Sequence, residues 1–248
     1  MKYFWETMES IQGNVGFNYF DALHWSWIIG AIVFAVICSF IYRKCDAKGR
    51  KIMRRLFVLL ILLDEGLKQY GLIAYGNWTF NDLPLHLCSI NIIIITYHSF
   101  KPNTTVDNFL YAVCLPSAIA AILAPIWTNL PLLNFMHIHS FTIHILLATY
   151  TVMLVAGGDI YPDIRLVAKA IMFTCIIAIP IYGVNLVLNT NFMFLMGVDE
   201  GNVLHFFQEN LGFHLLGVPI IESIIIFILY APFHIYRAIK SKDLINQE

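Results

Sequence analysis

Charged residues are scarce in this sequence. Asp, Glu, Lys and Arg make up only 12% of the 248 residues, whereas 59% are hydrophobic. A soluble domain carries about twice that share of charge, so the composition excludes an ordinary water-exposed globular fold. Acidic and basic residues nearly balance, with a formal net charge of −1. This balance gives no basic surface for nucleic acid, and we expect no nucleic-acid partner.

Signals for disulfides and for secretion are also missing. The five cysteines are odd in number and include no Cys-x-x-Cys pair, so we expect no disulfide framework. The residues before Ala22 include Glu6 and Asp21, where a secretory signal would carry a short basic segment. We therefore expect no cleavable signal peptide.

Long apolar runs dominate what remains. Each is roughly 17–25 residues long, which matches a helix crossing a bilayer core about 30 Å thick. Backbone groups in lipid must be satisfied within the segment, and the runs lack strand-like alternation, so only helices fit. We predict an all-α fold, a single domain over residues 1–248 formed by a bundle of seven transmembrane helices. These helices are expected near residues 22–42, 56–75, 84–100, 108–125, 138–156, 166–188 and 212–233.

Lys and Arg are concentrated in alternate connections. The first connection is rich in both, and the same side receives Lys101, Arg165 and the basic C-terminal tail. The connections near 77–83, 126–137 and 189–211 contain no Lys or Arg. The positive-inside rule then predicts an N-terminus outside and a C-terminus in the cytoplasm. We expect an integral membrane protein of a bacterial plasma membrane.

The third run opens on Leu-Pro-Leu-His-Leu-Cys-Ser-Ile-Asn, residues 83–91, which places His86, Cys88 and Asn91 at the outer mouth of an apolar helix. Polar groups in hydrocarbon are often functional, although such groups also serve as links between membrane helices. With Asp82 as the expected helix cap, Cys88 falls in the second turn. A thiol there needs a nearby imidazole for most of its activation as a nucleophile.

His144, in the outer part of the fifth run, is the best candidate for that imidazole. The alternative is a structural histidine that links two helices. A metal site built from His86, His144 and Glu222 lacks supporting ligand spacing. We therefore expect no metal and no cofactor.

Other polar residues fall in the same outer half of the bundle. Asp64 and Lys68 are four residues apart, which predicts an ion pair on one helix face, either structural or used to position a lipid headgroup. Asn185 and Asn191 end the sixth run, and Glu222 lies within the last. We expect these residues to support a polar chamber.

Several of these stretches together resemble a known family. They are residues 83–89, His144, Asn185 with the segment 191–195, and Glu222. The chain resembles the YwaF-like integral membrane family, which includes the transmembrane protein 164 acyltransferases. The resemblance implies seven helices and, for the eukaryotic branch, transfer of polyunsaturated acyl chains onto lyso-ether phospholipids through a cysteine. Cys88 matches that cysteine.

The first functional hypothesis is therefore a membrane acyltransferase acting on phospholipids and lysophospholipids. Cys88 would attack an acyl ester, His144 would take the thiol proton, and Asn91 or Asn191 would stabilise the oxyanion. A lipid acyl-ester hydrolase differs only in that water completes the second step. A transporter or binding protein that uses the polar chamber as a ligand pocket is the non-enzymatic alternative.

Overall fold

The computed structural model describes residues 3–8, 10–11, 15–198 and 202–245, and it describes side chains as far as residue 233. Every regular element in that part of the chain is helical. The predicted all-α class is therefore confirmed for the described residues. Six segments are long and apolar enough to cross a membrane: Ala22–Lys44, Phe80–Phe100, Thr104–Leu123, Phe135–Gly157, Ile164–Leu188 and His214–Phe233.

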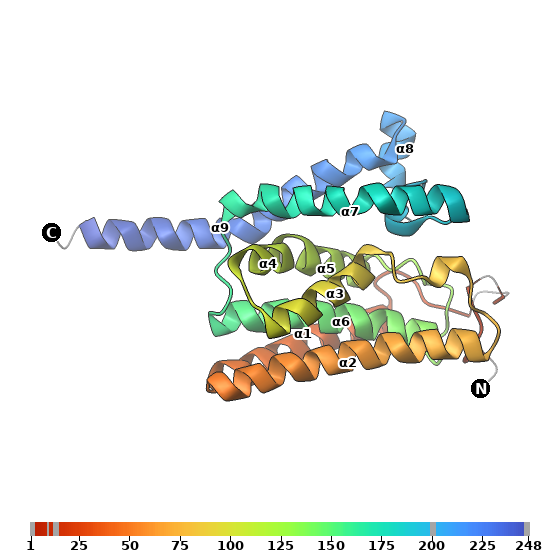
Figure 1. The fold of residues 1–248 in the computed structure, drawn as a ribbon, viewed down its shortest axis with the longest axis horizontal. Helices are drawn as coiled ribbons and strands as arrows, with labels where there is room; N and C mark the ends of the chain where they lie inside the picture. Colours follow the sequence, from red (N-terminus) through yellow and green to blue (C-terminus); the bar gives the residue numbers. More distant parts are fainter. Residues whose placement is uncertain (1–2, 9, 12–14, 199–201, 246–248) are drawn as a thin grey trace.

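The helices follow the predicted runs with a few additions (Figure 1). The α-helices are α1 (Ala22–Lys44), α2 (Ala47–Ala74), α3 (Leu87–Phe100), α4 (Thr104–Phe109), α5 (Leu115–Leu123), α6 (Phe135–Gly157), α7 (Val167–Leu188), α8 (His205–Leu211) and α9 (Gly217–Ile245). Short helical turns are η1 (Phe80–Asp82), η2 (Leu110–Cys114), η3 (Ile164–Leu166), η4 (Phe192–Phe194) and η5 (His214–Leu216). The α2 helix is 28 residues long, but its apolar part carries Asp64, Glu65 and Lys68. The seventh span therefore stays a prediction.

Asp and Asn side chains set the starts of several helices. Asp21 Oδ1 accepts the His24 N–H at 2.8 Å at the start of α1. Asp46 accepts the Gly49 N–H at the start of α2, and Asn134 accepts the His137 N–H at the start of α6. Such a cap stabilises a helix by about 1 kcal/mol. The caps explain why α2 and α6 begin before the apolar runs that predicted them.

The fourth predicted span consists of three pieces rather than one regular helix. Between α4 and α5, the turn η2 has π-helical geometry, and Pro116 lies two residues after its end, in the first turn of α5. Proline has no N–H to donate, and its ring crowds the carbonyl four residues earlier, so the regular ladder is interrupted there. The wider turn leaves Cys114 fully buried in the bundle core.

The α6 helix lies at the centre of the bundle. It packs against α1, α2, α3 and α5 (Figure 1), and Leu147, Tyr150 and Met153 on α6 are completely buried. The α7 and α9 helices form an outer layer, whose apolar side chains such as Val187 and Phe227 are about four-fifths exposed, at 83% and 76%. These faces are suited to contact with lipid.

Candidate functional site

Cys88 lies in the first turn of α3. The helix begins at Leu87, and His86 is its N-cap residue with extended backbone angles. Asp82 belongs to η1 instead, and its carboxylate accepts the Thr79 N–H at 2.8 Å and the Thr79 hydroxyl at 2.9 Å. The predicted cap at Asp82 and the second-turn position of Cys88 are therefore wrong. Asp side chains readily bond to nearby backbone in this way. Here the carboxylate of Asp82 closes the turn η1 and does not cap α3, which begins at Leu87.

The later start leaves backbone donors beside the thiol. The first bond within α3 runs from the Ile90 N–H to the His86 carbonyl at 3.1 Å. The N–H groups of Leu87 and Cys88 have no hydrogen-bond partner in the described part of the chain. Free N–H groups at a helix start can donate hydrogen bonds to an anion placed beside them.

His86 faces the loop after α7. Its Nδ1 accepts the Met193 N–H at 3.4 Å, so a neutral ring carries its proton on Nε2. The ring packs edge-on against Phe192, with centroids 5.2 Å apart. His86 and Cys88 share no hydrogen bond in the described residues. The loop fixes His86 in place over the start of α3.

Asn185 and Asn191 hold that loop together. Asn185 Oδ1 accepts the Phe192 N–H and the Thr190 hydroxyl, each at 2.9 Å, and its Nδ2 donates to the Phe192 carbonyl at 3.0 Å. The Asn191 amide bonds to the backbone of Met196 and of Gly197. Both amides are engaged within the loop, so their observed role is structural.

The loop contains strained backbone. Asn189, Met193 and Phe194 have positive φ angles of 53°, 57° and 55°. Each such non-glycine residue costs on the order of 1–2 kcal/mol. His214 adds another tie, because its Nε2 lies 2.8 Å from the Phe194 carbonyl. The surrounding hydrogen bonds therefore keep these residues in their unfavourable backbone conformations.

A cluster of acids and a histidine joins α2 to α6. His139 Nδ1 lies 3.1 Å from Asp64 Oδ2, and His139 Nε2 lies 3.8 Å from Glu65 Oε2. Thr142 donates its hydroxyl to Asp64. Lys68 Nζ lies 2.6 Å from Glu65 Oε1, so the predicted Asp64–Lys68 ion pair is wrong. Residues three apart also share a helix face, and Asp64 is already engaged by α6.

His144 has the tautomer that a base requires. Its Nδ1 lies 2.6 Å from the Ser140 carbonyl, and a carbonyl can only accept, so Nδ1 carries the proton. Nε2 then has a lone pair, with no partner in the described residues. Trp127 stacks on the imidazole with centroids 5.7 Å apart and planes within 10°. The buried Trp127 Nε1 has no hydrogen-bond partner among the residues that the structure describes.

Cys88 and His144 each interact electrostatically with residues of this polar cluster. Cys88 interacts electrostatically with Lys68 and Glu65, and His144 interacts with Asp64 and His139. No hydrogen bond joins the thiol to the imidazole in the described part of the chain. Both side chains therefore lie within electrostatic range of the α2 acids, but they do not bond to each other.

Two other predicted residues lie apart from this cluster. Asn91 is fully buried and donates to Ser117 Oγ at 3.2 Å, which links α3 to α5. Its Oδ1 has no partner within the described part of the chain. Glu222 is partly buried on α9 and has no bonding partner among the described residues. No group of three His, Cys, Asp or Glu residues in the described ranges could hold a metal ion.

Membrane-length helices around a buried polar cluster define a polytopic integral membrane protein. The chain belongs to the TMEM164 family, whose model matches residues 19–230. The match covers most of the chain and confirms the family resemblance. No curated protein and no solved structure matches the chain.

Proposed function

We propose that this protein is an integral membrane acyltransferase that moves a fatty acyl chain between phospholipid and lysophospholipid. The observation that carries the proposal is the setting of Cys88 in the first turn of α3. In the described residues, the backbone N–H groups of Leu87 and Cys88 in this turn have no hydrogen-bond partner. Such donors can stabilise the anion that forms when a thiol attacks an ester.

The proposed topology has seven spans, with the N-terminus outside and the C-terminus in a bacterial cytoplasm. The α2 helix is the seventh span. Two of its intramembrane charges offset each other, because Glu65 pairs with Lys68, and Asp64 accepts the Thr142 hydroxyl. Pairing of this kind lets ionisable residues stay inside a membrane bundle. Cys88 then lies beneath the outer leaflet, where lipid esters can enter from the side.

In the first proposed step, His144 Nε2 takes the thiol proton and the Cys88 sulfur attacks the ester carbonyl of a phospholipid. A carbon–sulfur bond forms and the carbon–oxygen ester bond breaks. The proton passes from His144 to the departing oxygen, which leaves as the lysophospholipid hydroxyl. The two side chains make no hydrogen bond without substrate, and such contacts commonly tighten only when substrate binds.

In the second step, the hydroxyl of another lysophospholipid attacks the thioester. His144 removes the hydroxyl proton, the new ester bond forms, and the Cys88 thiolate leaves and is reprotonated. The N–H groups of Leu87 and Cys88 are the proposed oxyanion donors in both steps. They replace the Asn191 amide, which bonds to Gly197 and Met196.

The test uses the purified full-length protein in lipid nanodiscs that contain isotope-labelled lysophospholipid. We expect labelled phospholipid to form, together with a hydroxylamine-sensitive acyl group on the Cys88 peptide. Cys88→Ala should abolish both signals. Cys175→Ala removes an exposed thiol of α7 and should leave them unchanged.

Transfer by Cys88→Ala at the wild-type rate would overturn the nucleophile. Release of free fatty acid without labelled phospholipid would favour the hydrolase instead. If neither product appears, the enzymatic proposal fails and the binding-protein alternative stands.

A further inference from the structure

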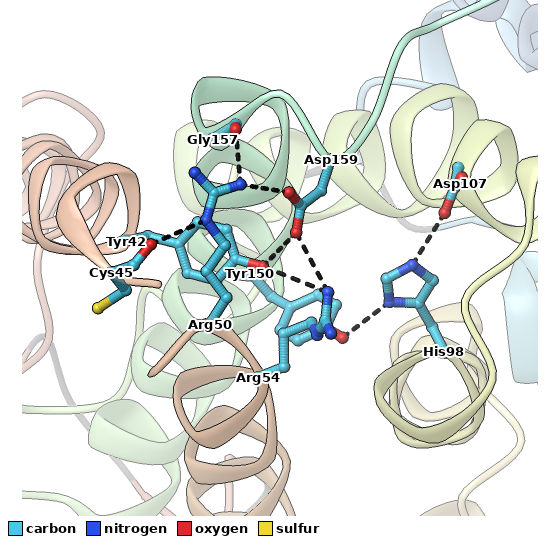
Figure 2. A network of polar contacts seen from close by, with 9 residues as sticks. All are labelled: Tyr42, Cys45, Arg50, Arg54, His98, Asp107, Tyr150, Gly157 and Asp159. Carbon is cyan, nitrogen blue, oxygen red and sulfur yellow. Dashed lines mark hydrogen bonds and ion pairs between the residues drawn. The ribbon is translucent and has the colours of Figure 1, made fainter. Parts of the chain in front are cut away.

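A second polar cluster lies at the other end of α2. Arg50 and Arg54 stand near the start of that helix, and Asp159 follows the end of α6 (Figure 2). Fourteen residues separate Arg54 from Lys68, which is about 21 Å along a helix. This cluster is therefore distinct from the surroundings of Cys88.

One carboxylate serves both arginines. Arg50 Nη1 donates to Asp159 Oδ1 and, at 2.8 Å, to the Gly157 carbonyl. Arg54 Nη1 donates to Asp159 Oδ2 at 3.1 Å, and Tyr42 donates its hydroxyl to the same oxygen. Two guanidinium groups share a single negative charge, so the group keeps a surplus positive charge.

Several guanidinium donors stay unused. Nη2 of Arg50 and Nη2 of Arg54 have no partner in the described part of the chain, and Arg54 Nε is buried without one. Only 25% of the Arg50 side chain and 16% of the Arg54 side chain are exposed. An unpaired donor on a buried cation is costly, so an added anion would be stabilised here.

These groups line a hollow of about 440 Å³, which we name the arginine pocket. Its lining residues are Cys45, Ala47, Arg50, Arg54 and Asp159. A guanidinium fork matches the spacing of phosphate oxygens. Further exposed basic residues stand on the ends of α1 and α2 outside the pocket lining, and they contribute only a diffuse, solvent-screened attraction for anions: Arg43, Lys44, Lys48, Lys51 and Arg55.

We propose that the arginine pocket binds the phosphate group of an anionic phospholipid. The end of α1 presents exposed apolar side chains, including Phe40 and Ile41 at 59% and 47% exposure, against which acyl chains could lie. Basic pockets between membrane helices are a recurrent setting for anionic lipid headgroups. The inference does not depend on the chemistry proposed for Cys88.

Native mass spectrometry of the purified full chain tests this site with phosphatidylglycerol and phosphatidylcholine of matched acyl chains. Wild type should bind phosphatidylglycerol more tightly, by roughly tenfold, because the choline cation of phosphatidylcholine cancels the charge of its phosphate and is repelled by the surplus positive charge of the pocket. Arg54→Gln should remove that preference. Lys51→Gln makes the same charge change on the exposed side of α2 and should alter binding less than twofold.

A second variant distinguishes loss of the site from misfolding of Arg54→Gln. Ala47→Trp fills the pocket and leaves both arginines with Asp159, so it should also remove the preference. Equal losses in Arg54→Gln and Lys51→Gln would overturn the site in favour of diffuse surface charge, as would full binding by Ala47→Trp. Glycerol 3-phosphate is the soluble probe. Binding of this ester as tightly as the lipid would overturn the assignment to a phospholipid.

Discussion

Asn185 offers a quantitative test of how the loop over His86 is held. Asn185→Ala removes three hydrogen bonds, two to Phe192 and one to Thr190. Each buried hydrogen bond contributes about 1 kcal/mol, so the loop should lose about 3 kcal/mol of local stability. The left-handed residue Met193 gives a further reason for the loop to open once these bonds are gone.

Hydrogen exchange followed by mass spectrometry measures this loss directly. A free energy of 3 kcal/mol corresponds to roughly a hundredfold faster exchange of the Phe192 amide, since about 1.4 kcal/mol is a factor of ten. Thr190→Val removes one bond and should accelerate exchange about fivefold. Asn210→Ala, on the exposed side of α8, should leave the loop unchanged.

Equal exchange rates in Asn185→Ala and Thr190→Val would refute this role of Asn185, because the effect must scale with the number of hydrogen bonds removed. Equal acceleration of exchange across α7 would refute it as well. Such a result would mean that the side chain stabilises the helix rather than the loop.

Two further predictions concern the polar cluster. Lys68→Met leaves Glu65 without its cation and should lower the free energy of unfolding by about 3 kcal/mol. Adding Glu65→Gln to this variant should restore most of that loss. Thermal unfolding of the single and double variants measures both effects, and additive losses would contradict the pairing. His144→Gln should slow the labelling of Cys88 by a lipid-like ester probe that occupies the substrate site, with little change in thermal stability. His137→Gln should lower thermal stability and leave the labelling rate of Cys88 unchanged, because both ring nitrogens of His137 are bonded, to Trp27 and to the Leu130 carbonyl. Equal labelling rates in the two variants would rule out His144 as the base.

The apolar runs predicted most helices because membrane solvation constrains length and hydrophobicity so strongly. The run at 22–42 became α1, Ala22–Lys44, and the run at 166–188 became α7, Val167–Leu188. The fourth run did not become one helix, since a π-turn before Pro116 divides it. Hydropathy averages over a window, so it does not register a change in the hydrogen-bond ladder of one turn.

The candidate site was harder to predict because spacing leaves partners undetermined. Glu65 and Asp64 both lie within reach of Lys68 by helix geometry, and only the position of His139 on α6 decides which acid remains available. In the same way, the side chain of Asp82 turns back to Thr79, which moves the start of α3 to Leu87. That shift alone brings Cys88 into the first turn, where backbone N–H groups are free. The chemistry proposed for the thiol therefore follows from a contact made six residues before it.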